Sequence, residues 1–83
     1  MIKMEVIRIL KLDGAGATKA FADVLVGDSF KIESFRIVEG EKGLFVGLPG
    51  EEGKNGKWHN TVIPLSREIK EELEKIVLEA YQA

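Results

Sequence analysis

The sequence contains no cysteine and only one histidine. The first absence excludes disulfide bonds and thiolate metal sites, and a lone histidine cannot complete the usual zinc sites. A chain of 83 residues forms one domain. It buries only a modest share of its surface, so its folded state is marginally stable unless a further interaction contributes. With disulfide bonds and thiolate metal sites excluded, oligomerisation is the common source of stability that remains. We therefore expect a single domain over residues 1–83 that forms a homodimer.

The chain also lacks a strong charge of either sign and any apolar run of membrane-spanning length. Its formal net charge is −2, so binding to nucleic acid would need a local basic patch rather than bulk charge. The first residues lack the apolar core of a secretory signal. With 45% apolar and 31% charged residues, the composition is typical of a globular domain. We expect a cytoplasmic protein without membrane contact.

Apolar alternation and glycine-rich turns predict strands, and a helical period follows them near the C-terminus. The expected strands cover residues 4–12, 18–26, 30–37, 44–48 and 58–64. Ser66 is a good N-cap for a helix over residues 66–81. The apolar stripe of this helix has helical spacing and consists of Ile69, Leu73, Ile76, Val77 and Ala80. The predicted fold is α+β, a five-stranded mainly antiparallel meander with one C-terminal helix packed on it through Leu73 and Ile76.

The stretch from Gly40 to Pro49 is the centre of this arrangement. Glycines at 40 and 43 favour a turn, and the apolar run 44–48 is typical of a strand buried on both faces. Pro49 cannot donate a ladder hydrogen bond, so the strand should end there. The polar segment 50–57 is expected to be a flexible loop that carries a contact surface, with a tight turn at Asn55-Gly56.

The strand faces follow from the alternation. In the first strand, we expect one face to carry Val6, Arg8, Leu10 and Leu12, and the other face to carry Ile7 and Ile9. The second strand presents a narrow face suited to close packing under a helix, formed by Thr18, Ala20, Ala22, Val24 and Val26.

The third strand changes phase in its middle. Phe30 and Ile32 share one phase, whereas Phe35 and Ile37 share the other. A β-bulge at residues 33–34 would bring all four side chains to one face. The alternative is a strand that is buried on different faces at its two ends.

No constellation of side chains indicates an enzyme. His59 is expected to be a polar residue on a strand face, because no second ligand or partner accompanies it. Glu51 and Glu52 lie in the polar loop, where solvation makes them poor acid–base groups. The loop glycines do not match a phosphate-binding motif. We expect no catalytic residue, cofactor or metal. The basic side chains are expected to be scattered over the surface; they include Arg8, Lys31, Arg36, Lys54, Lys57 and Lys70.

Several stretches, in order along nearly the whole chain, together resemble the SpoVG family (stage V sporulation protein G, the septation protein). The most specific is GLFVGLP at 43–49. The others are AFADVLV at 20–26, FKI at 30–32, FRIVEG at 35–40, Pro64, and VLEAY at 77–81. The resemblance implies a small bacterial cytoplasmic homodimer with a sheet and a C-terminal helix. It also implies regulatory roles in septation and sporulation, with sequence-selective binding to DNA and RNA in some members.

The resemblance places candidate nucleic-acid contacts at Lys54, Lys57 and Lys70, the last at a position where the family often has arginine. Gly50 and the acidic Glu51 and Glu52 stand where the family typically carries a serine and basic residues. Acids near a phosphate oppose binding, so any binding here should be weak and strongly dependent on salt. The alternative hypothesis is a protein-interaction module that uses a sheet edge and the 50–57 loop, whose four charges sum to zero.

Overall fold

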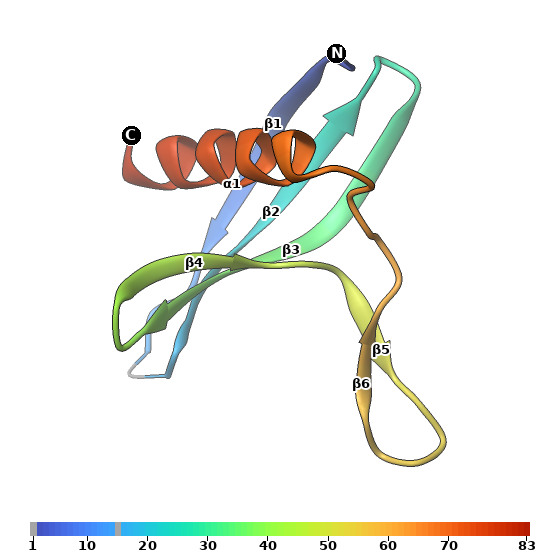
Figure 1. The fold of residues 1–83 in the computed structure, drawn as a ribbon. Coiled ribbons are helices and arrows are strands. Elements are labelled where there is room, and N and C mark those ends of the chain that lie inside the picture. Colours follow the sequence, from blue (N-terminus) through green and yellow to red (C-terminus); the bar gives the residue numbers. More distant parts are fainter. Residues whose placement is uncertain (1, 15) are drawn as a thin grey trace.

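The structure is a computed structural model that describes residues 2–14 and 16–83. In chain order, these residues form the elements β1 (Met4–Lys11), β2 (Thr18–Val26), β3 (Phe30–Gly40), β4 (Gly43–Gly47), β5 (Gly50–Glu52), β6 (Trp58–Asn60) and α1 (Arg67–Gln82). The first four strands form an antiparallel sheet in sequence order, and β5 and β6 form a separate hairpin (Figure 1). Helix α1 crosses one face of the four-stranded sheet and contacts β1, β3 and β4.

The predicted α+β class, meander and C-terminal helix are confirmed, but a single five-stranded sheet is wrong. The chain leaves the main sheet at Pro49, which has no N–H to donate to the ladder with β3. The Pro49 carbonyl instead accepts hydrogen bonds from the backbone N–H groups of Thr61, at 2.9 Å, and Val62, at 3.4 Å. These bonds close the base of the hairpin, so residues 58–60 pair with β5 rather than extending the main sheet.

The 50–57 segment therefore begins as a strand and is not wholly a loop. Residues 50–52 are β5, and the turn that follows has Gly56 at φ +77°, as the Asn55-Gly56 signal predicted. Gly50 permits the close pairing. A Cβ atom at this position would lie 2.8 Å from Trp58 Nε1 and 2.9 Å from Asn60 Cα. The hairpin is thus a defined arm that projects from the sheet.

The core lies between α1 and the sheet. Its fully buried apolar residues are Ala20, Ala22, Val24, Phe35, Ile37, Leu73 and Val77. The small side chains of β2 are buried in one cluster with Leu73 and Val77 of the helix, and Ile76 packs against the same core. Ser66 Oγ accepts a hydrogen bond from the Ile69 N–H at 3.2 Å and caps the helix. The predicted docking of the helix through its apolar stripe is confirmed.

A β-bulge in β3 brings its apolar residues to the helix side. Ala22 pairs with Phe35 and Val24 pairs with Ile32, so Asp23 faces two residues of β3. Ser34, one of these two, has φ +72°. Phe35 is buried and Ile32 packs on the core. The bulge prediction is therefore confirmed, although Phe30, beyond the reach of the helix, is 71% exposed.

Two predictions about strand faces are wrong. A second bulge lies in β1 between Val6, which pairs with Val24, and Arg8, which pairs with Asp23. Because of it, Val6 and Ile9 pack on the helix side while Arg8 faces away. In β4, Phe45 is 47% exposed, because α1 covers only one face of this edge strand. The predicted burial of residues 44–48 on both faces does not occur.

The helix–sheet packing can be tested by placing a charge in it. Replacing Leu73, which is 4% exposed, by aspartate removes apolar burial and strands a carboxylate. We expect Leu73→Asp to lower the free energy of unfolding by at least ~3 kcal/mol. In a domain of this size, that lowers the Tm by about 12 °C or more. Thermal unfolding followed by circular dichroism measures the shift.

The control is Lys75→Asp, a change on the exposed side of the same helix. It should cost less than about 1 kcal/mol, mainly through helix propensity. Equal melting temperatures for the two variants would show that the stripe does not hold the helix on the sheet.

Candidate functional site

A groove of about 240 Å³ lies between α1, the end of β4 and the β5–β6 hairpin. We call it the helix–hairpin groove. Its lining residues are Arg36, Val46, Gly47, Leu48, Trp58, Asn60, Lys70, Leu73 and Glu74. They come from β3, β4, β6, α1 and the residue after β4. The groove thus gathers polar and aromatic side chains that are far apart in the sequence.

Arg36 and Trp58 form the most specific contact of this groove. The Arg36 guanidinium carbon lies 5.0 Å from the centroid of the indole ring, within the range of a cation–π interaction. Trp58 remains 53% exposed. Among the described residues, Arg36 Nε is buried without a hydrogen-bond partner. The contact holds a half-exposed aromatic ring and a cation in a fixed relation at the edge of the groove.

Gly47 makes room for this arginine. A Cβ atom at position 47 would lie 2.9 Å from Arg36 Nη2 and 3.2 Å from its Nε. The last residue pair of the β3–β4 ladder joins Arg36 and Gly47, which places the guanidinium against the bare backbone of β4. The glycine is therefore part of the site because of the space it leaves.

The charge of the groove is small. Arg36 and Lys70 contribute two cations, and Glu74, one helical turn after Lys70, contributes a carboxylate. In the hairpin, His59 Nε2 lies 3.4 Å from Glu51 Oε1 across the two strands. Because its net charge is small, this arrangement attracts phosphates only weakly.

The structure separates the three predicted contact residues. Lys70 lines the helix–hairpin groove, whereas Lys54 and Lys57 lie at the hairpin turn, the end of the arm farthest from α1 (Figure 1). Arg36 and Lys70 line one groove, so the expectation that the basic residues are scattered is wrong for this pair, whereas Lys54 and Lys57 lie apart from that groove. Sequence analysis missed Trp58 and Asn60 as site residues. The one available signal was the only tryptophan of the chain, placed directly after a polar glycine-rich turn.

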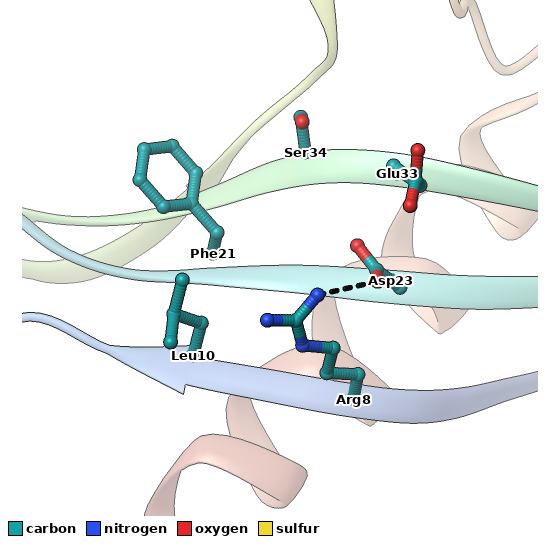
Figure 2. Close-up of a pocket in the computed structure, with 6 residues that line it drawn as sticks. All are labelled: Arg8, Leu10, Phe21, Asp23, Glu33 and Ser34. Atoms are coloured by element: carbon teal, nitrogen blue, oxygen red, sulfur yellow. Dashed lines mark ion pairs between the residues drawn. The ribbon is translucent and has the colours of Figure 1, made fainter.

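A second hollow, of about 230 Å³, lies on the face of the main sheet that α1 leaves open. The two bulges meet there at Asp23. Figure 2 shows Arg8 reaching from β1 toward Asp23 on β2, with 4.0 Å between Arg8 Nη1 and Asp23 Oδ2. Asp23 is 8% exposed, and Glu33 and Ser34 of β3 complete the polar side opposite Leu10 and Phe21. The ion pair partly neutralises a carboxylate that the sheet buries.

A third groove, of about 280 Å³, is lined only by apolar side chains and a proline. This apolar groove lies where α1 begins and the ends of the strands meet; its walls include Met4, Ile32, Phe35, Val62 and Ile69. Large apolar side chains stand exposed on its rim: Leu65 is 97% exposed, Ile63 65% and Ile2 50%. Such a cluster marks a protein contact more often than a surface that faces only water.

Comparison with known proteins identifies the family. The SpoVG family model matches residues 2–83. The chain belongs to the SpoVG family. It is 38% identical over 82 residues to a protein of Archaeoglobus fulgidus, covering 99% of this chain and 96% of that relative. Proteins of Desulforudis audaxviator and Lachnospira eligens are 36% and 32% identical over 76 residues, covering 92% of this chain and 86% of each relative. All three carry the name "Putative septation protein SpoVG".

Within residues 2–14 and 16–83, no three histidine, cysteine or acidic side chains are grouped so that they could hold a metal ion. The helix in these ranges is too short and too polar to cross a membrane.

The fit of Arg36 against Gly47 makes a testable prediction. Gly47→Ala should displace the guanidinium, because the new methyl group occupies its place and the long side chain can move. The indole then loses its cation and becomes more accessible to solvent. We expect stronger quenching of the Trp58 emission by acrylamide without loss of the fold.

Gly14→Ala is the matched control, because a Cβ atom at position 14 would meet no atom within 4 Å. Its quenching should equal that of the parent chain. If Gly47→Ala also behaves like the parent, Gly47 does not determine the position of Arg36.

Proposed function

We propose that this protein is a non-enzymatic regulator that binds nucleic acid through the helix–hairpin groove, in the manner its membership of the SpoVG family suggests. The observation that carries the proposal is the convergence of Arg36, Trp58 and Lys70 in one groove. A cation for phosphate, an aromatic face for a base and an amide for base edges are the parts that nucleic-acid sites use. The names of the relatives point to septation as the process that such a regulator serves.

The proposed binding is limited by charge. Lys70 and Arg36 offer two cations in the groove, and Lys54 and Lys57 offer two more on the arm. Glu51 and Glu52 lie on the same arm and oppose phosphates within a Debye length of about 8 Å. The alternative, a module that binds only protein partners through the hairpin and a sheet edge, is supported by the neutral sum of the four hairpin charges.

Reversal of the two hairpin acids distinguishes these proposals. We expect Glu51→Lys with Glu52→Lys to raise affinity for duplex DNA and to steepen the salt dependence, with a slope near −0.9 per added phosphate contact. Both side chains are exposed, so the fold should persist. Fluorescence anisotropy of labelled DNA at low and moderate salt measures both quantities.

The control is Glu39→Lys with Glu41→Lys. It makes the same change in net charge at the β3–β4 turn, which lies away from the hairpin (Figure 1). A gain that is equal in both double variants would reflect bulk charge rather than the groove. Absence of binding by all three proteins at low salt would leave the protein-interaction module as the function.

We also propose that the protein is a homodimer and that the second copy covers the apolar groove. The apolar groove and its rim are self-complementary, because Leu65 is an almost fully exposed apolar side chain beside a groove that has no charged lining residue. In a two-fold dimer the same patch meets itself, so the knob of each copy can fill the groove of the other. An apolar centre depleted of charge is typical of homodimer interfaces.

This proposal predicts that Leu65→Asp yields a monomer. A carboxylate in an apolar contact is stranded without a partner, whereas in a monomer it is solvated. Sedimentation equilibrium at micromolar concentration should give twice the 9.2 kDa chain mass for the parent and the single chain mass for the variant. Leu10→Asp, on the opposite side of the sheet, should remain dimeric. A monomeric parent, or a dimeric Leu65→Asp variant, would remove the apolar groove as the interface.

A further inference from the structure

We propose that the helix–hairpin groove selects single-stranded nucleic acid, with an unpaired base stacked on Trp58. This inference rests on the proposed nucleic-acid function and names the class of strand that the site takes.

The indole ring of Trp58 is fixed in orientation and half-exposed to solvent. Trp58 is 53% exposed although it lies in a folded hairpin, and its backbone is fixed by pairing with Glu52. The Arg36 guanidinium lies over the ring, 5.0 Å from its centroid, so the indole is presented in one orientation. A rigid, half-exposed aromatic side chain loses little conformational entropy when a flat ligand stacks on it.

Apolar, polar and cationic side chains surround the ring in the groove. Val46 and Leu48 provide apolar walls, and the Asn60 side chain offers both donors and acceptors next to the indole. Lys70 stands on the facing helix, where an ammonium can reach a phosphate beside the stacked base. These are the elements by which proteins hold single strands: a base on an aromatic ring and a cation along the backbone.

Charge contributes little to binding in this groove. Duplex binding derives mainly from the neutralisation of many phosphates. Here the groove has two cations against Glu74, and the whole chain has a net charge of −2. Bases in a duplex are paired and stacked inside, so Trp58 cannot use them. Stacking is therefore the larger contribution available to this site, and only an unpaired strand supplies it.

The experiment uses Trp58 as its own reporter, because it is the only tryptophan in the chain. Short oligo(dT), short oligo(U) and a DNA duplex of the same length are titrated into the full chain at low and moderate salt. We expect both single strands to quench the Trp58 emission and to bind at least ~10-fold more tightly than the duplex, with a shallower dependence on salt than the duplex shows. Oligo(dU) is titrated as well, because it differs from oligo(U) only in the sugar, and the ratio of these two affinities identifies which sugar the site prefers.

Variants test the role of the ring by anisotropy of labelled oligonucleotides. Trp58→Ala should lower affinity for single strands by about 5- to 100-fold, whereas Trp58→Phe should retain most of it, since any aromatic face stacks on a base. Phe45→Ala removes another exposed aromatic side chain, which lies outside the groove, and should leave affinity unchanged.

The outcomes separate the two proposals. Duplex binding as tight as single-strand binding, or unchanged affinity in Trp58→Ala, overturns the single-strand inference while nucleic-acid binding stands. Lack of binding to every oligonucleotide at low salt overturns the proposed function itself. If Trp58→Ala fails to fold, Trp58→Phe decides: a loss of affinity as large as that expected for alanine contradicts stacking.

Discussion

The position of Pro49 determines the architecture of this protein. The residue is buried at the end of β4, and its missing N–H stops the ladder with β3. Its carbonyl oxygen then receives the returning chain through the backbone N–H groups of Thr61 and Val62. One residue therefore both releases the chain from the main sheet and fastens the base of the hairpin. The helix–hairpin groove exists because the arm diverges at this point.

Small residues pack closely on both sides of the helix–hairpin groove. Alanines at 20 and 22 are buried in the same core as Leu73, and Leu73 and Lys70 form the α1 side of the groove. On the other wall, Gly47 leaves space for Arg36 and Gly50 leaves space for β6, because each presents bare backbone. The site is thus built from absent side chains as much as from present ones.

Local signals in the sequence predicted local structure well. The helix, its Ser66 cap, the Asn55-Gly56 turn and the bulge beside Ser34 each depend on a few neighbouring residues. The destination of β6 could not be predicted in this way, because strand pairing joins distant segments and depends on how the chain turns at Pro49. The bulge at Ile7 was hidden as well, since apolar residues on both sides of it blur the alternation. Arg36 and Trp58 were missed as a pair for the same reason: their contact exists only after β5 and β6 have left the sheet.

Leu73 lines both the helix–hairpin groove and the apolar groove. The same buried side chain thus forms part of the wall of each groove. A change in its size or shape alters both walls at once, so neither groove can be reshaped at this position without reshaping the other.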